Sequence, residues 1–169
     1  TDQVVTMALD RCGWHDVTLT VTDSVKGATV WTRSKYIYVI HAARYVAMAE
    51  EGGNDGNDGQ TVDKPMASVE LAVARAIEAA EYAHAPTTVY VGEGQFTQAC
   101  ANVNGAVSVI GAGRDKTFVS AISNLGAVSD KIGALFVLTH ADALVRDLTI
   151  WKGRYTGMDR NGVGVYMSK

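Results

Sequence analysis

The second half of the sequence is a series of short apolar runs separated by turn residues, and this pattern restricts the fold more than any other feature. From Thr87 onward the runs read TTVYV, AVSVIGAG, TFVSAI, ALFVL, ALVRDLTI and GVGVYM, with Gly, Asn, Asp and Ser in the gaps. No helical pattern intervenes, which excludes an alternating βαβ fold. Regular short strands of this kind are typical of a sandwich, a barrel or a solenoid.

One amphipathic helix is predicted just before these strands, over residues 65–85. Pro65 suits a first helical turn, Asp63 or Ser68 can cap it, and Pro86 ends it. Apolar residues recur at three- and four-residue spacings and form one stripe, with the glutamates away from it. The stripe contains Met66, Val69, Val73, Ile77 and Ala80, and the glutamates are Glu70, Glu78 and Glu81.

Residues 1–40 predict a β-hairpin. In WHDVTLTVTD, three apolar residues alternate with threonines, so one face of the strand is apolar. The bend DSVKG follows, and ATVWTRSKYIYV returns as a second strand. An isolated hairpin is marginal in water, so the apolar face needs a covering partner.

The stretch CGWHDVTLTVTDSVKGATVWTRSKYIYV resembles the C-terminal half of a PKD domain, an immunoglobulin-like sandwich of secreted and surface proteins. The Gly13 turn, the VTLTVTD strand and the closing YIYV strand carry this resemblance. The upstream strands of that family are missing from the sequence. We therefore expect a longer protein or another chain to supply them, with the apolar face as a partner surface.

A longer resemblance covers roughly Tyr45 to Lys169. The order GNDGNDGQ…KPMASVELAVARA, TVYVGEGQF, VSVIGAG and LVRDLTIWKG resembles the start of right-handed parallel β-helix proteins of the pectin lyase-like superfamily. In that family a loop and an amphipathic helix cap the solenoid. The predicted fold is therefore mainly β: partial PKD-like sandwich strands (1–40), a linker and acidic loop (41–64), a capping helix (65–85) and the start of a parallel β-helix (86–169).

This resemblance implies which strands form each coil. Val107–Ile110, Val119–Ile122 and Phe136–Leu138 would form the three faces of a first coil, Leu144–Ile150 would open the second, and Val163–Met167 would continue it. Val145 is out of phase with Leu148 and Ile150, so a bulge or turn is expected near Arg146 and Asp147. VGEGQF and VIGAGRDK lack phosphate-loop spacing and are predicted to be strand-ending turns.

The acidic loop is the first candidate site. Its carboxylates (Asp55, Asp58 and Asp63) are hard oxygen ligands of the type that calcium prefers. Their spacing is not that of an EF-hand. The alternative, which we favour, is a pair of Asx/Gly turns that bring the chain onto the helix.

Two further sets of residues are candidates for sugar recognition or chemistry. A carboxylate and a cation in the cluster His140, Asp142, Arg146 and Asp147 suit sugar acids or proton abstraction, whereas charged turn residues are the simpler interpretation. Trp151 and Tyr155 suit stacking on sugar rings, or turn packing. The predicted carbohydrate-binding set is Trp151, Tyr155, Arg146 and Asp147, and no catalytic constellation is recognised.

The 169-residue chain has a net charge of −3, which gives no electrostatic case for nucleic acid. No apolar run approaches the roughly 18 residues of a membrane span. Cys12 and Cys100 have no CxxC partner, and we expect two independent thiols.

The sequence therefore predicts an extracellular or cell-surface structural or adhesive module. Its predicted partners are copies of itself through open β edges, neighbouring domains of a longer surface protein, or polysaccharide. The alternatives are the N-terminal portion of a polysaccharide lyase or hydrolase, and a non-catalytic carbohydrate-binding module. Calcium is the one cofactor considered.

Overall fold

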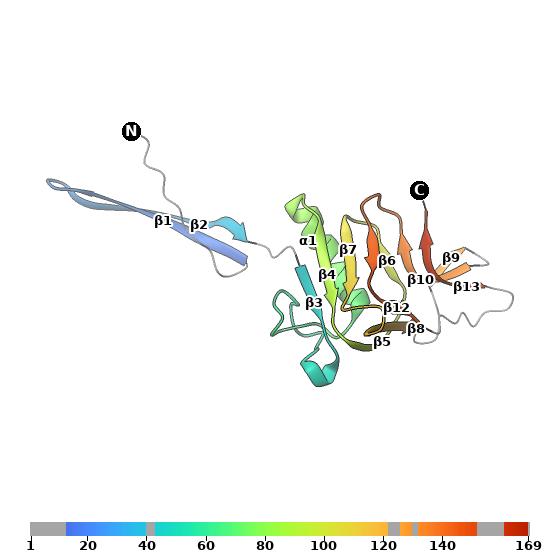
Figure 1. Ribbon diagram of the computed structural model, residues 1–169. Helices are drawn as coiled ribbons and strands as arrows, with labels where there is room; N and C mark the ends of the chain where they lie inside the picture. Colours follow the sequence, from blue (N-terminus) through green and yellow to red (C-terminus); the bar gives the residue numbers. More distant parts are fainter. Residues whose placement is uncertain (1–12, 40–42, 122–125, 130–131, 152–160, 169) are drawn as a thin grey trace. The chain divides into compact units, whose positions relative to one another are not determined.

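The computed structural model describes residues 13–39, 43–121, 126–129, 132–151 and 161–168. The chain divides into two units, Thr1–His41 and Ala42–Lys169, beside the boundary expected at residue 40. The protein is mainly β, with an antiparallel hairpin in the first unit and mostly parallel sheets in the second (Figure 1).

The first unit contains the predicted hairpin, which is confirmed. Strand β1 (Gly13–Asp23) pairs antiparallel with β2 (Gly27–Val39). The Asp23 carboxylate closes the turn, because its Oδ1 accepts hydrogen bonds from the backbone N–H groups of Val25 (2.8 Å) and Lys26 (2.9 Å). These two bonds lower the pKa of Asp23, and the bond from Lys26 has the larger effect.

The register of the hairpin gives it one apolar and one threonine-rich face. Leu19 lies opposite Trp31, and on the other face Thr18 lies opposite Thr32, with 3.0 Å between their Oγ1 atoms. Leu19 and Trp31 remain 56% and 51% exposed, and none of the hairpin side chains whose burial is described is buried. The hairpin therefore has a sidedness but, among the described residues, no core of its own.

The described residues of the second unit form three sheets of mainly parallel strands, and strands β3, β4 and β7 of the first sheet are seen side by side in Figure 1. The first sheet joins β3 (Ala43–Val46), β4 (Thr87–Val91), β7 (Val107–Gly111) and β11 (Leu144–Arg146). The second joins β5 (Gly94–Gln98), β8 (Thr117–Ala121) and β12 (Thr149–Ile150). The third joins β6 (Ala101–Val103), β10 (Ile132–Leu138) and β13 (Asn161–Met167), and β9 (Gly126–Ser129) pairs antiparallel with β10.

The chain visits these three sheets three times in the same order, as β4–β5–β6, β7–β8–β10 and β11–β12–β13. The strands that were expected to form the first coil therefore belong to the second set. One more set of strands, β4–β5–β6, precedes it. Two strands of the first set were missed: β5, in GEGQF, was interpreted as a turn, and β6 was not predicted. Strand β3 was missed as well, because it lies in the segment 41–64 that was expected to be a linker and loop. In the structure Gly94–Gln98 is strand β5, paired in parallel with β8, because Phe96 is buried between small or polar neighbours. Ile122 lies outside the described residues.

The turn expected near Arg146 and Asp147 is confirmed. Asp147 has a φ of 57°, and its carbonyl accepts a hydrogen bond of 3.0 Å from the Gly113 N–H. This left-handed residue changes the phase of the chain. As a result, Val145, before it, and Leu148, after it, both pack against the core.

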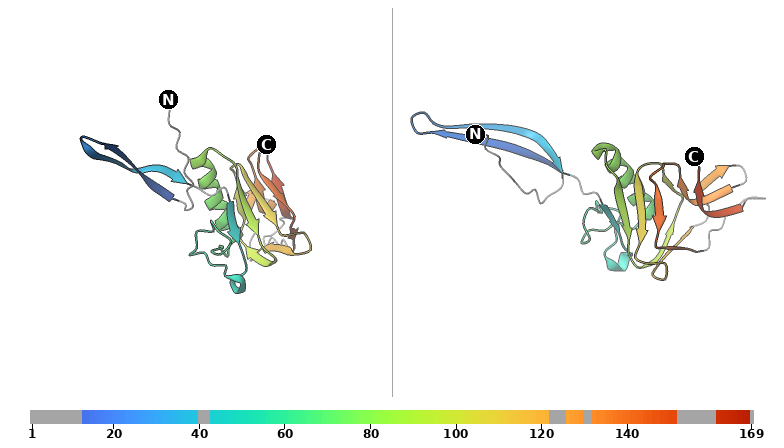
Figure 2. Two further views of the ribbon diagram at one scale, coloured as in Figure 1. Left: turned by 60° about the vertical axis from the view of Figure 1, so that its left-hand side comes forward. Right: turned by 45° about the horizontal axis from the view of Figure 1, so that its top comes forward.

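Helix α1 (Val69–Ala83) lies beside the parallel strands in both views of Figure 2. Ser68 occupies the N-cap position, Pro65 precedes the helix, and His84 ends it in a left-handed conformation with its N–H directed at the Ala80 and Glu81 carbonyls. Three of the five predicted stripe residues are buried on the helix, Met66 is buried just before it, and Ile77 is half-buried. Three further helix alanines are buried with them: Ala72, Ala76 and Ala79.

The acidic loop covers the outer edge of β3. The Tyr45 N–H donates to the Gly59 carbonyl (2.7 Å), the Met66 N–H donates to the Tyr45 carbonyl (2.8 Å), and the Ala47 N–H donates to the Met66 carbonyl (3.0 Å). An uncovered edge strand is a template for pairing with other chains. Here the loop occupies these edge positions, and a short 3₁₀ helix, η1 (Ala49–Glu51), leads into it.

Candidate functional site

A groove crosses the outer face of the first sheet, and we call it the β3–β4–β7 groove. Each of these strands ends with a large outward residue, one core residue and a small residue. The triplets are Tyr45-Val46-Ala47, Tyr90-Val91-Gly92 and Ile110-Gly111-Ala112. Because the strands run parallel with Tyr45 opposite Tyr90 and Tyr90 opposite Ile110, the large residues form a wall and the small ones a floor.

The two tyrosines of the wall stack on each other. Their ring centroids are 5.6 Å apart and their planes differ by 23°. The hollow beside them has a volume of about 370 Å³, within the range of small-ligand sites, and Glu51, Val62 and Pro65 also line it. Apolar side chains predominate, and Glu51 carries the one carboxylate among the described lining residues.

Gly92 keeps the floor of the groove low. A Cβ placed there would lie 3.2 Å from the Val46 carbonyl oxygen and 4.0 Å from Oε2 of Glu51. The Gly92 N–H also donates to the Val46 carbonyl (2.8 Å). A side chain at this position would therefore crowd β3 and fill the space beside the Glu51 carboxylate.

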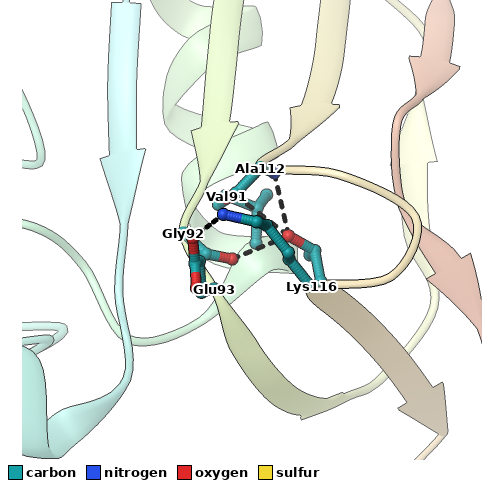
Figure 3. Close-up of polar contacts among 6 residues, drawn as sticks. Val91, Gly92, Glu93, Ala112 and Lys116 are labelled. Carbon is teal, nitrogen blue, oxygen red and sulfur yellow. Dashed lines mark hydrogen bonds and ion pairs between the residues drawn. The ribbon is translucent and has the colours of Figure 1, made fainter.

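A buried threonine, Thr117, joins the two floor residues Gly92 and Ala112 by hydrogen bonds. Thr117 is 0% exposed, and its Oγ1 accepts a hydrogen bond from the Ala112 N–H (2.9 Å) and donates to the Gly92 carbonyl (2.8 Å). Figure 3 shows these contacts together with the ion pair between Lys116 Nζ and Glu93 Oε1 (2.5 Å). The hydrogen bond that Lys116 donates to Glu93 is the main cause that raises the pKa of Lys116.

One residue of the predicted carbohydrate set, Arg146, continues the row of large residues, and Asp147 follows it in the chain. Arg146 lies opposite Ile110 on the next strand, so it follows the two tyrosines and Ile110 in one row across the sheet. Its Nη1 donates to Oδ2 of Asp147. Both residues are exposed, so an ion pair between them contributes little to stability.

Trp151, a third residue of that set, is not brought to this groove. Trp151 follows β12, donates its backbone N–H to the Val119 carbonyl (2.8 Å), and packs edge to face on Phe118 with ring centroids 6.5 Å apart. This is the turn-packing alternative, although the side chain is still 45% exposed. Tyr155 lies outside the described residues, so its role stays a prediction.

The four-residue cluster expected around His140 is divided in the structure. His140 and Asp142 line a different cavity, of about 390 Å³, together with Glu81 and His84 at the end of α1. His140 Nδ1 accepts the Asp142 N–H at 3.1 Å, which is the geometry of a tight turn. Arg146 and Asp147 belong to the sheet described above.

The acidic loop forms the turns that its alternative interpretation expected. Asp55 accepts hydrogen bonds from the N–H groups of Ala67 (2.9 Å) and Ser68 (2.8 Å) and from the Ser68 hydroxyl, so it caps the start of α1 from outside the helix. Burial alone would raise its pKa, but these bonds outweigh burial and lower it. Asp58 accepts the Gln60 N–H (3.0 Å).

Calcium binding by this loop stays a prediction. Asp63 is exposed, and the three carboxylates occupy separate surroundings. Within the part of the chain that the structure describes, no group of three or more His, Cys, Asp or Glu side chains is placed to hold a metal ion.

Sequence reasoning missed three groove residues, Tyr45, Tyr90 and Glu51. The signal was the recurrence of a large, a core and a small residue as YVA, YVG and IGA. Comparisons with protein-family models, curated proteins and solved structures found no match. No helix among the described residues has the length and apolar character needed to cross a membrane.

Proposed function

We propose that the second unit is a helix-capped parallel β-solenoid, as its resemblance to right-handed β-helix proteins implies. The proposal is supported by the repeated order in which the chain visits three parallel sheets. The positions of α1 in the core and of the loop along β3 suit an N-terminal cap.

A cysteine pair tests the solenoid. Ser108 and Leu144 are opposite one another on parallel strands of successive sets, which places their Cα atoms about 4.8 Å apart. In a chain with both native cysteines changed to serine, Ser108→Cys with Leu144→Cys should oxidise to an intramolecular disulfide. A chain that keeps its far-UV circular dichroism but forms no such bond would contradict the proposed stacking.

We propose that this solenoid acts as a structural or adhesive module at a cell surface or outside the cell. The observation that carries the adhesive role is the β3–β4–β7 groove, an apolar hollow with one carboxylate, built on a rigid sheet. Exposed apolar hollows of this kind are typical of binding sites. The surface location rests on the two sequence resemblances.

Retention on immobilised material tests the adhesive role. Purified chain should be retained on at least one member of a panel of polysaccharides, cell-wall preparations and surface proteins, and should leave a retained polymer intact. Unsaturated products from a polyuronate would instead support the lyase alternative. Loss of retention in Tyr90→Ala but not Trp151→Ala assigns binding to the groove, and the reverse pattern assigns it to the predicted carbohydrate residue.

Self-association is proposed through the hairpin, because the loop occupies part of the β3 edge. Within the described residues, β1 and β2 pair only with each other and keep apolar side chains exposed. Light scattering and electron microscopy should show oligomers that Trp31→Asp with Leu19→Asp abolishes. A monomer at every concentration tested would end this part of the proposal and leave the adhesive role standing.

A further inference from the structure

We propose that the β3–β4–β7 groove binds a lysine side chain of a partner protein, with the aliphatic stem along the wall and the ammonium group at Glu51. This inference rests on the adhesive function and names the chemistry of its ligand.

The shape of the groove suits a narrow, extended apolar stem. The wall of Tyr45, Tyr90 and Ile110 crosses three strands, a length of about 10 Å at the usual strand spacing. The small residues beside the wall leave a hollow of about 370 Å³. Lysine side chains pack their methylene stems along apolar surface while the charged end stays polar, and the lining of this hollow offers both environments.

The charge of the groove selects a cation. Glu51 is the one charged residue among the described lining residues, and its Oε2 lies beside the floor at Gly92. Arg146 lies beyond Ile110, at the end of the row farthest from β3, where its guanidinium is held by Asp147. The negative charge of the groove therefore lies beside Gly92, and the positive charge of Arg146 lies at the β11 end of the row, which orients a single cation toward Glu51.

The aromatic rings favour a cation over a neutral sugar. Stacking on a sugar needs an open ring face, and Tyr45 and Tyr90 turn one face of each ring toward the other. Few polar side chains line the groove, so the many hydroxyl groups of a sugar would lack partners. An ammonium group needs one carboxylate, and Glu51 supplies it.

The first test uses short peptides and the whole chain. Acetyl-Gly-Gly-Lys-Gly-Gly-amide is titrated while the backbone amide signals of Gly92 and Ala112 are followed by NMR. We expect saturable shifts at these amides, and at least roughly tenfold weaker binding when the lysine is replaced by norleucine, which keeps the stem and removes the charge. Equal binding of the norleucine peptide would overturn the proposal.

The second test uses a matched pair of variants. Glu51→Gln should weaken binding of the lysine peptide roughly tenfold, whereas Glu50→Gln removes the same net charge from the same short helix outside the groove and should change it less than about twofold. Equal effects of the two variants would show non-specific attraction and overturn the proposal. Free pentylamine binding as tightly as the peptide would assign the groove to small amines instead of a protein partner, and would also overturn it.

The two proposals can fail separately. A chain that is retained on the surface panel but whose Glu51→Gln variant is retained equally well keeps the adhesive function and loses the lysine site. A chain that binds the peptide at Glu51 but is retained on no surface keeps the site and loses the adhesive function.

Discussion

The hairpin and the second unit begin from the same sequence pattern and reach different states. Both contain strands in which valine alternates with polar or small residues. In the hairpin, Leu19 and Val21 stay 56% exposed, whereas Val89 and Val109 in the parallel sheets are 0% exposed. The difference is a second layer: the sheets cover one another and α1, and the described part of the hairpin has nothing over its apolar face.

This difference teaches that alternation specifies which face of a strand is apolar and leaves open what covers that face. Burying an apolar side chain of this size contributes roughly 1.5–3 kcal/mol. The second unit gains this contribution many times over in one core, while two strands alone are marginal. The stability of the two regions should therefore respond very differently to the same kind of substitution.

The largest expected effect comes from truncating an aromatic side chain in each region. Phe136 is 0% exposed in the core, so Phe136→Ala should lower the free energy of unfolding of the second unit by about 3–5 kcal/mol. Trp31→Ala, at a side chain that is 51% exposed, should change the same quantity by less than about 0.5 kcal/mol. Hydrogen–deuterium exchange read by mass spectrometry measures both, and similar losses of protection in both variants would break the comparison.

Removing the Thr117 hydroxyl should lower the free energy of unfolding by less than Phe136→Ala does. Thr117→Val keeps the shape of the buried side chain but leaves the Ala112 N–H and the Gly92 carbonyl, whose hydrogen bonds to Thr117 are part-buried, without their hydroxyl partner. We expect the free energy of unfolding to fall by about 1–3 kcal/mol in urea denaturation. Thr97→Val removes an exposed hydroxyl from the neighbouring strand and should cost much less, so equal costs would contradict this role for Thr117.

Removing the Asp55 side chain that caps α1 should have a smaller effect on stability than removing the Thr117 hydroxyl. Asp55→Ala removes the hydrogen bonds to Ala67 and Ser68 and should cost about 1 kcal/mol at neutral pH. Because the pKa of Asp55 is lowered in the folded state, this stability is present above about pH 3.8 and is lost as the pH falls through the folded pKa. Thermal melts from pH 7 to pH 2 should show the two chains converge in acid. Asp58→Ala, which loses one exposed bond, is the control, and a constant difference across this range would be evidence against the cap.

The smallest expected effect concerns Glu70, which was expected to lie away from the core and is half-buried instead. Burial is the main cause that raises its pKa above 4.5 in the folded state, and Oε2 of Glu70 lacks a hydrogen-bond partner. Folding therefore favours the protonated form, and stability falls as the pH rises from about 4.5 through the folded pKa.

Glu70→Gln should remove this loss. Its melting temperature relative to the parent chain should rise between pH 4 and pH 7 in thermal melts. Glu78→Gln, at an exposed position on the same helix, should show no such rise. Identical pH profiles for the two variants would show that burial of Glu70 has no energetic consequence.

Much of the local structure could be predicted from the sequence because it depends on neighbours in the chain. The hairpin followed from alternation and the DSVKG bend, the helix from its stripe and from Pro86, and the turn at Asp147 from the phase change after Val145. Strand β5 was missed because Phe96 is its one large apolar residue and the others are Gly, Gln and Thr, which give a weak apolar signal. The Asx turns of the acidic loop were the favoured interpretation, and the structure supplies their hydrogen bonds.

The sequence by itself determined the hairpin, the helix and the strands with a strong apolar pattern, and it contains the large–core–small triplets at Tyr45, Tyr90 and Ile110. Only the tertiary structure decided that these triplets lie side by side, that Arg146 joins their row, and that His140 and Trp151 do not. The physical reason is that a triplet fixes only its own strand, whereas a groove requires register between strands some 20 to 45 residues apart. That register depends on the core packing of Val46 and Val91 and on the Thr117 hydroxyl, which no local pattern reveals.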